Sequence, residues 1–180
     1  DIPEFYDMHH VSAFRKLLRR IHCKIVYHFM ARVDRFILLT EQMAMPLHVG
    51  NRPYLVMEGM CGDVADEPPV SKPQPFSMLY TGRLNRRYGL ELLLQAMKEL
   101  QDPNIELWLC GSGEMEEEIR TYAAQDSRIR FFGFLPHEEA VRLQKQATVL
   151  VNPRTNQGEY TKYSFPSKTM EYMASGRPVM

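Results

Sequence analysis

The stretch FSMLYTGRLNRRYGLELLLQAMKEL, residues 76–100, decides the fold class of this chain. It begins as a short, largely apolar strand, continues through a basic loop, and ends in a helix from about Gly89 to Leu100. The apolar residues of that helix recur three and four positions apart and form one stripe: Leu90, Leu93, Leu94, Met97 and Leu100. A strand followed at once by an amphipathic helix is the unit from which parallel α/β sheets are built.

The same strand-then-helix unit recurs three more times toward the end of the chain. The expected strands are residues 105–109, 129–132 and 149–151, and the expected helices are residues 114–125, residues 136–147 and a short last helix that opens at Ser164. Four such units predict an α/β fold, a Rossmann-like open parallel sheet with helices on both faces. Ligands of such sheets bind at the carboxyl ends of the strands, so we expect a site in the loops that follow them.

A domain boundary is expected before the first of these units. Residues 62–75 are acidic and contain four prolines, which neither pair inside a sheet nor continue a helix: Pro68, Pro69, Pro73 and Pro75. We therefore expect a first domain segment at residues 1–61, a linker at 62–75 and a second domain at 76–180.

The first segment opens with an expected helix at residues 11–33. Its apolar residues share one side, and the other side is basic: Val11, Phe14, Leu17, Leu18, Ile21, Ile25 and Phe29 against Arg15, Lys16, Arg19, Arg20, Lys24 and Arg32. A basic amphipathic helix can rest on an anionic membrane surface, whereas a solvated basic face over a core stripe is the commoner arrangement. Both alternatives stay open at this point.

Two short strands follow that helix. Residues 36–39 are expected to form a buried strand, residues 41–45 a helical turn, and residues 54–57 a second strand. Strand, short helix and strand in this order predict part of a parallel α/β layer.

The composition of the 180-residue chain bounds its partners. Lys plus Arg and Asp plus Glu number 22 each, and this zero net charge argues against nucleic-acid binding, which needs a basic field. Three widely spaced cysteines without a pairing pattern predict a reducing, cytoplasmic setting. Six histidines without metal-ligand spacing predict that no metal ion is bound, and we expect no other cofactor. The chain begins with Asp and stops where a new apolar strand starts, so we expect a fragment truncated at both ends.

The last helix carries the features of an anion site. Ser164 can cap it, Gly176 can end it in a left-handed conformation, and Lys168 lies in its first turn. Unsatisfied backbone N–H groups, the helix dipole and an ammonium group would then converge on one spot. Glu171 follows one turn later, where its carboxylate can accept two hydroxyl hydrogen bonds from a sugar ring. The alternative is an ordinary solvated ion pair between Lys168 and Glu171.

Basic and glycine-rich loops lie at the same predicted edge. Arg83 follows the first strand directly, with Arg86 and Arg87 close by, and guanidinium groups suit a diphosphate because they donate two parallel hydrogen bonds. At least one of Arg86 and Arg87 is expected to be a solvated loop charge instead. Gly111-Ser-Gly113 resembles a dinucleotide fingerprint, but position 116 is Glu and four glutamates crowd that helix start. We therefore expect a tight turn there and no NAD.

Several motifs together resemble one enzyme family. They are Tyr80-Thr-Gly-Arg-Leu84 with Gly89-Leu90, Leu109-Cys-Gly-Ser-Gly113, Phe132-Gly-Phe-Leu135, Lys162-Tyr-Ser-Phe-Pro-Ser-Lys168 and Glu171-Tyr-Met-Ala-Ser-Gly-Arg-Pro-Val179. In order and spacing they resemble the donor-binding half of family 4 retaining glycosyltransferases, which have the GT-B architecture of two Rossmann-like domains. The resemblance covers residues 76–180. Residues 33–60 resemble, more loosely, the last strands of the acceptor-side domain.

The resemblance implies transfer of a sugar from a nucleoside diphosphate sugar to a glycan or lipid-linked acceptor, with retention and without metal, in polysaccharide or glycolipid biosynthesis. It implies diphosphate binding by side chains or backbone N–H groups of Arg83, Arg87, Lys168, Ser164, Phe165 and Ser167. It further implies ribose binding by Glu171 and nucleobase binding by the backbone at Phe134 and Leu135. No catalytic residue is assigned.

Two positions depart from the family pattern. Tyr88 stands where a lysine is usual, so Arg86, Arg87 or Lys168 must supply the second positive charge. Tyr163 stands where many members have the first of two glutamates. A non-catalytic nucleotide-binding module and a sugar-nucleotide epimerase of the same architecture remain alternatives. The expected location is the cytoplasm, with a peripheral contact at the inner face of the plasma membrane if the basic helix binds lipid, and the fragment is expected to bind donor without efficient transfer.

Overall fold

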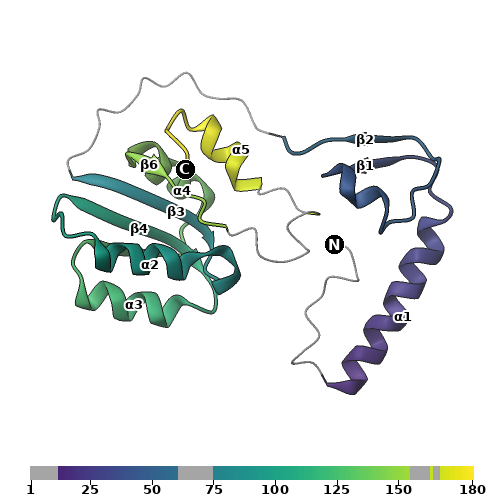
Figure 1. Cartoon of the computed structure of the whole chain (residues 1–180), viewed down its shortest axis with the longest axis horizontal. Helices are drawn as coiled ribbons and strands as arrows, with labels where there is room; N and C mark the ends of the chain where they lie inside the picture. The colour runs from purple at the N-terminus through teal and green to yellow at the C-terminus, as the bar shows by residue number, and fades with distance from the viewer. Residues whose placement is uncertain (1–11, 61–74, 155–162, 164–166) are drawn as a thin grey trace. The chain divides into compact units, whose positions relative to one another are not determined.

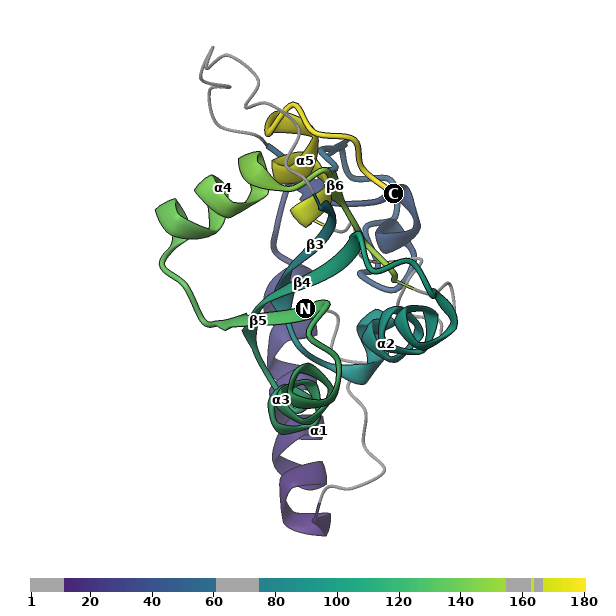
Figure 2. The ribbon, with the colours of Figure 1, turned by 90° about the vertical axis from the view of Figure 1, so that its left-hand side faces the viewer.

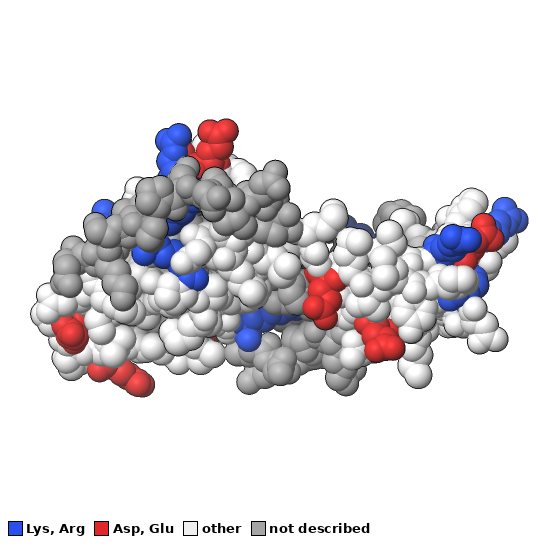
Figure 3. Space-filling model, turned by 90° about the horizontal axis from the view of Figure 1, so that it is seen from above, with Lys and Arg blue, Asp and Glu red and all other residues white. Residues whose placement is uncertain are grey.

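The computed structural model describes residues 12–60, 75–154, 163 and 167–180, and the chain divides into two compact units (Figure 1). Among the described residues, one unit holds 12–60 and 163, and the other holds 75–154 and 167–180. The linker expected at residues 62–75 lies almost wholly outside the described part of the chain. Figure 3 shows Lys and Arg side chains scattered among Asp and Glu on the face that it displays.

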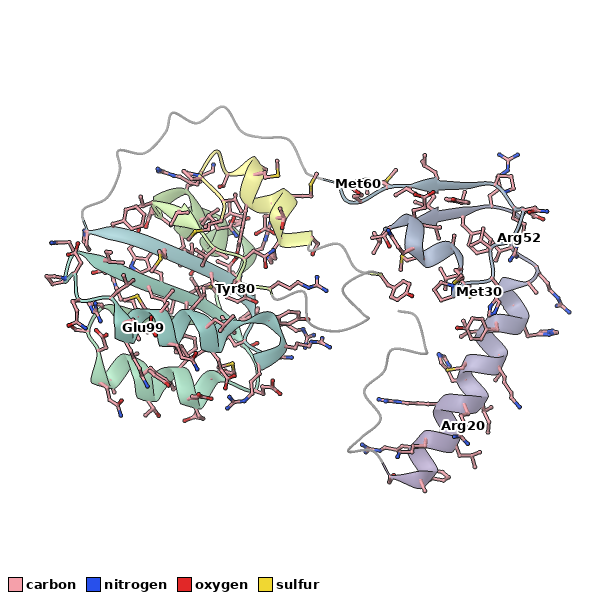
Figure 4. All side chains as sticks on the ribbon, in the orientation of Figure 1. Arg20, Met30, Arg52, Met60, Tyr80 and Glu99 are labelled. Atoms are coloured by element: carbon pink, nitrogen blue, oxygen red, sulfur yellow. The ribbon has the colours of Figure 1, made fainter. Side chains whose placement is uncertain are left out.

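The first unit contains one long helix and one small sheet. Its elements are α1 (Ala13–Met30), β1 (Phe36–Leu38), the 3-10 helix η2 (Glu41–Ala44) and β2 (Tyr54–Val56). Strands β1 and β2 pair in parallel, as the order of elements predicted. Arg52 fixes the end of α1, because its guanidinium donates hydrogen bonds to the carbonyls of Met30 at 2.7 Å and Val33 at 3.1 Å (Figure 4).

One expectation for this unit is wrong, and one of the two alternatives left open for α1 is not seen. The segment 36–39 was expected to be a buried strand, but only Leu38 is buried and Ile37 is 70% exposed. A sheet of two strands leaves side chains of its second face in solvent unless another layer covers them, because successive side chains point to opposite faces. The stripe of α1 does not pack into a core either, since the helix has no buried residue. None of the described helices is both long and apolar enough to cross a membrane.

The second unit is built around a four-stranded parallel sheet. Its strands are β3 (Phe76–Arg83), β4 (Ile105–Ser112), β5 (Ile129–Gly133) and β6 (Val149–Leu150), in the spatial order β5-β4-β3-β6. Its helices are η3 (Arg86–Tyr88), α2 (Leu90–Glu99), α3 (Glu116–Gln125), α4 (His137–Gln146) and α5 (Ser167–Ala174). Val179 adds a parallel bridge beside Leu150, where a further apolar strand was expected to start.

Helices cover both faces of this sheet, which confirms the predicted fold class (Figure 2). Helices α2 and α3 pack over one face, where the core includes Leu90, Leu94, Met97, Met115 and Ile119. Helices α4 and α5 pack over the other face, where the core includes Leu79, Trp108, Leu143, Leu150 and Tyr172. Alternate residues of the central strands supply the two cores, as the two-residue period of a strand requires.

The strand order places a topological switch point between β3 and β6. The chain runs outward from β3 through β4 to β5 and then crosses back to β6 on the other side of β3. In open α/β sheets, the crevice at such a reversal is the usual ligand site, at the carboxyl ends of the strands. The loops after β3 and β6 meet there, since a Cβ atom built on Gly89 would come within 2.0 Å of the Pro153 carbonyl oxygen.

Strands β3 and β4 are longer than expected. The glycines of residues 111–113 were expected to form a tight turn, but Gly111 continues β4 and pairs in register with Gly82 of β3. A Cβ atom on Gly111 would lie 1.8 Å from the Gly82 carbonyl oxygen, so only a residue without a side chain fits. These glycines therefore allow two backbones to approach each other.

The last helix ends as the sequence predicted. Helix α5 runs to Ala174, and Gly176 follows with a φ of 71° in the left-handed region. The described helix begins at Ser167, and the expected cap at Ser164 lies outside the described residues.

Candidate functional site

Helix α5 is held against the carboxyl ends of β3 and β6, at the switch point. The Tyr172 side chain is completely buried, and its hydroxyl donates to the Thr81 carbonyl at 3.0 Å and accepts from the Thr81 N–H at 2.7 Å. The Asn152 side chain, just beyond β6, donates to the Thr169 hydroxyl at 3.1 Å in the first turn of α5. The first turn of α5 therefore lies at the edge where a ligand is expected.

Gln144 of α4 links the sheet to α5. Its side chain is completely buried, and its Nε2 atom donates to Thr81 Oγ1 at 3.0 Å and to Glu171 Oε1 at 2.5 Å. The Gln144 Oε1 atom is buried and has no hydrogen-bond partner among the described residues. The carboxylate of Glu171 is thus tied to the sheet through a neutral amide.

Glu171 also forms an ion pair with Lys168. The Lys168 Nζ atom lies 3.1 Å from Oε1 and 3.0 Å from Oε2, and the side chains are 41% and 26% exposed, respectively. The expected alternative, an ion pair between these two residues, is thus present. However, the Glu171 side chain is mostly buried, and its carboxylate also accepts a hydrogen bond from Gln144. Burial acts to raise the pKa of Glu171, but hydrogen bonds from Gln144 and Lys168, with the charges of Lys168 and His137, outweigh it and lower the pKa. Glu171 is therefore ionised at neutral pH.

Arg83 is the last residue of β3, two positions beyond Thr81. Its side chain is exposed and forms no hydrogen bond or ion pair with another described residue. A guanidinium at the end of a strand and beside the switch point is placed to meet an anion.

Arg86 is engaged elsewhere. Its guanidinium pairs with Glu91 and with Glu118 at 2.5 Å, and its backbone N–H donates to Glu114 Oε1 at 2.9 Å. The glutamates around the start of α3 thus fasten the loop after β3. Arg86 is therefore not a candidate for the second positive charge at the site, and it is not a simple solvated charge either.

Arg87 lies beside the residue that replaces the usual lysine. Its Nη2 atom donates to the Tyr88 hydroxyl at 2.9 Å, and its guanidinium stacks on the Tyr88 ring, 4.9 Å from the centroid. Both side chains come from the loop after β3, at the same edge as Arg83.

The loop after β5 carries the two residues assigned to the nucleobase. Phe134 is 76% exposed, whereas Leu135 packs against the core under α4 and α5. The Leu135 backbone hydrogen-bonds to the Cys110 thiol at the end of β4. Burial raises the pKa of that thiol, partly offset by this hydrogen bond and by the charge of Lys168.

Ser164 and Phe165 lie outside the described residues, and Ser167 is the first residue of α5. Within the described ranges, no group of three or more His, Cys, Asp or Glu side chains could hold a metal ion.

The sequence of the second unit matches one known family. Residues 75–180 match the model of the family described as "Glycosyl transferases group 1", which is more than half of the chain. The chain belongs to this family. The resemblance noted from its motifs is thereby confirmed at the level of group 1 glycosyltransferases.

Two relatives illustrate the match. An uncharacterized glycosyltransferase of Methanocaldococcus jannaschii is 32% identical over 107 residues, which cover 57% of this chain and 26% of the relative. A D-inositol 3-phosphate glycosyltransferase of Corynebacterium efficiens is 32% identical over 112 residues, which cover 56% of this chain and 25% of the relative. The aligned part of the chain thus spans about a quarter of the length of these glycosyltransferases.

Solved structures share the fold. The pneumococcal O-GlcNAc transferase GtfA, in complex with UDP and GlcNAc, matches with a TM-score of 0.64 and 20% identity, over 86% of this chain and 31% of that chain. Sucrose-phosphate synthase from Thermosynechococcus elongatus matches with a TM-score of 0.64 and 22% identity, over 98% of this chain and 46% of that chain. At these identities the likeness shows the fold alone.

Sequence reasoning missed three residues of the candidate site in this group 1 glycosyltransferase: Thr81, Gln144 and Tyr172. Gln144 carried a signal that could have found it. It lies at helical spacing among buried apolar residues, which are Ala140 and Leu143 of α4 and Ala147 directly after it. A polar residue inside an apolar stripe is buried with a hydrogen-bond partner, because an unpaired buried amide is costly.

Proposed function

We propose that this chain is the donor-binding half of a retaining glycosyltransferase, together with part of its acceptor-side domain. The reaction would move a sugar from a nucleoside diphosphate sugar to a glycan or lipid-linked acceptor, in polysaccharide or glycolipid biosynthesis. Residues 1–61 would belong to the acceptor-side domain, 62–75 would be the linker, and 76–180 would bind the nucleotide sugar. Membership of the group 1 family supports this proposal.

The observation that carries the proposal is a set of cationic groups at the switch point. Arg83 ends β3 without an acidic partner among the described residues, and the first turn of α5 brings Lys168 to the same edge. The diphosphate would bind between them, with Arg87 and the N–H groups of Ser164, Phe165 and Ser167 as further donors. Fixed positive groups would also stabilise the leaving diphosphate, so no metal ion is required.

Lys168 can serve two anions in turn. In the structure, the Lys168 ammonium forms an ion pair with the Glu171 carboxylate. A diphosphate bound at the first turn of α5 would attract the Lys168 ammonium away from Glu171, because a diphosphate carries more negative charge than one carboxylate. Glu171 would then accept hydrogen bonds from the ribose hydroxyls, while the loop at Phe134 and Leu135 contacts the base.

We further propose a peripheral contact between α1 and an anionic membrane at the cytoplasmic face. Six apolar side chains on one side of the helix are 47–68% exposed: Phe14, Leu17, Leu18, Ile21, Ile25 and Phe29. The half-buried residues of α1 lie on the opposite side: Lys16, Arg19, Cys23, Val26, Tyr27 and Met30. The apolar stripe therefore faces away from the other described residues of its unit, as in a helix that lies in a lipid surface.

The charge of α1 favours anionic lipid as its partner. The helix contains five Lys and Arg residues and no Asp or Glu, in a chain whose net charge is zero. Clusters of basic residues beside an apolar face add electrostatic attraction to anionic headgroups.

Calorimetric titration of the chain with UDP, GDP and ADP tests donor binding. We expect saturable binding of at least one of them, and weaker binding by Arg83→Ala. Arg120→Ala is the control, because the Arg120 guanidinium pairs with Glu116 within α3 and stacks on the Phe131 ring, so it is already engaged. Absence of binding by all three nucleotides, in folded protein, would contradict the proposal.

A further inference from the structure

The orientation of the Gln144 amide is fixed by chemistry. An ionised carboxylate can only accept hydrogen bonds, so the group that faces Glu171 Oε1 at 2.5 Å must be the NH₂ of Gln144. The same NH₂ donates its second hydrogen to Thr81 Oγ1 at 3.0 Å. Both donors of this completely buried side chain are therefore used.

The partners of Gln144 are themselves held in place. Tyr172, next to Glu171 on α5, is hydrogen-bonded to the N–H, carbonyl and hydroxyl of Thr81. Thr81 belongs to β3, so the sheet, α4 and α5 meet in one hydrogen-bonded group. The position of the Glu171 carboxylate thus depends on the sheet and on α4 as well as on its own helix.

Gln144 and Lys168 hold Glu171 in different ways. Lys168 is charged and 41% exposed, so an arriving anion can draw it away. Gln144 is neutral and buried, so an anion exerts little force on it and it keeps its hydrogen bond. One carboxylate oxygen would stay fixed, and the lone pairs released by Lys168 would point at a ligand.

We propose that Gln144 is a positioning residue that orients Glu171 to accept the hydroxyl groups of a ribose. The inference rests on the proposed function, because it presupposes that the chain binds a nucleoside diphosphate. It adds that preference for ribose over a sugar without 2′ and 3′ hydroxyls depends on a buried side chain that does not touch the nucleotide. Loss of a hydrogen bond to a charged group changes affinity about tenfold.

The test compares two ligands and three proteins by calorimetry. The ligands are whichever of UDP, GDP and ADP binds most tightly and its 2′,3′-dideoxy counterpart. The proteins are the wild type, Gln144→Met and Gln146→Met, where Gln146 is an exposed residue of the same helix. Methionine has a similar length but donates no hydrogen bond.

We expect the wild type and Gln146→Met to prefer the ribonucleotide. In Gln144→Met this preference falls about tenfold, while affinity for the dideoxynucleotide stays within about twofold of wild type. In a Glu171→Ala background, Gln144→Met has no further effect on the preference. An unchanged preference in folded Gln144→Met overturns the inference and leaves the proposed function intact.

Equal weakening of both ligands shows a merely structural role for Gln144 and also overturns the inference. If the wild type binds none of the three nucleotides, the proposed function fails and the inference fails with it. Should Gln144→Met not fold, Gln144→Asn keeps the amide but withdraws it by one methylene, and the same selective loss of ribose preference is expected.

Discussion

The hydroxyl of Tyr172 donates a hydrogen bond to the Thr81 carbonyl at 3.0 Å and accepts one from the Thr81 N–H at 2.7 Å. This pair joins a helix to a strand 91 positions earlier in the chain. Burial is the main cause that raises the pKa of Tyr172 to about 12, so the hydroxyl stays neutral near pH 7. The hydroxyl therefore keeps both hydrogen bonds between α5 and the sheet near neutral pH.

Removing this hydroxyl should destabilise the second unit. In Tyr172→Phe the Thr81 N–H loses a buried partner, and we expect the free energy of unfolding to fall by about 1–3 kcal/mol. Urea unfolding followed by circular dichroism measures this change. Tyr122→Phe is the matched control, because the Tyr122 hydroxyl has no hydrogen bond with another described residue, and it should change stability by less than about 0.5 kcal/mol. Equal effects of the two variants would refute the link.

The binding of nucleoside diphosphates should depend strongly on Arg83. We expect Arg83→Ala to weaken the best of UDP, GDP and ADP by about 10- to 100-fold, because hydrogen bonds to a charged group are lost. Arg83→Lys should recover part of the affinity, since an ammonium keeps the charge but not the two parallel donors. Calorimetry at two salt concentrations separates the loss of affinity due to charge, which salt weakens, from the loss due to the two hydrogen bonds. Wild-type affinity in Arg83→Ala would remove this residue from the site.

Stability should depend on pH through Glu171. Its pKa is lower in the folded chain than the ordinary value of 4.5, so its ionised form stabilises the fold above that pH. This contribution is lost as the pH falls through the folded-state pKa. We expect the stability difference between wild type and Glu171→Gln to be largest near neutral pH and to shrink below about pH 4. Urea unfolding of both proteins at several pH values checks this, and a difference that grows toward acid would contradict it.

The close approach of β3 and β4 should make Gly111 intolerant of any side chain. A Cβ atom there would lie 1.8 Å from the Gly82 carbonyl oxygen, so we expect Gly111→Ala to cost at least about 3 kcal/mol. Gly133→Ala is the control, because Gly133 also has a positive φ but has no heavy atom within 4 Å of the added Cβ. That variant should cost about 1–2 kcal/mol. Thermal and urea unfolding distinguish the two outcomes.

Binding of α1 to lipid should require both anionic headgroups and the apolar stripe. We expect the chain to sediment with vesicles that contain phosphatidylserine, and to do so less with phosphatidylcholine alone or at high salt. Ile21→Asp should reduce sedimentation several-fold, whereas Met45→Asp should not, because Met45 is 85% exposed but lies outside α1. Equal binding to both vesicle types, or no binding, would refute the membrane contact.

The sequence predicted those features that depend on local patterns. The apolar runs located the strands, and the spacing of Leu90, Leu94 and Met97 located a helix face that the structure buries. The local sequence around Gly82 and Gly111 did not indicate that both glycines belong to paired strands. That role depends on the backbone of the neighbouring strand. Local patterns therefore fixed the elements but not their ends.

The candidate site was predicted only in part, because its contacts join distant positions. Arg86 could not be told from Arg87 by spacing, since its partner Glu118 lies 32 residues away. Gln144 is 63 residues from Thr81 and 27 from Glu171, so no short motif contains the group. Such contacts follow from the packing of α4 and α5 on the sheet.

Asn152, directly after Val151 at the end of β6, is bonded to two later segments of the second unit. Its side chain binds Thr169 at the start of α5, and its backbone N–H donates to the Met180 carbonyl at 2.7 Å. The end of β6 is therefore held to the first turn of α5 and to residue 180 by contacts among described residues alone. Substitutions between residues 155 and 162, none of which is a proposed site residue, can therefore accumulate during evolution without breaking the contact between Asn152 and Thr169. Sequences descended from this one can thus differ over those eight positions while Asn152 still joins the end of β6 to the first turn of α5.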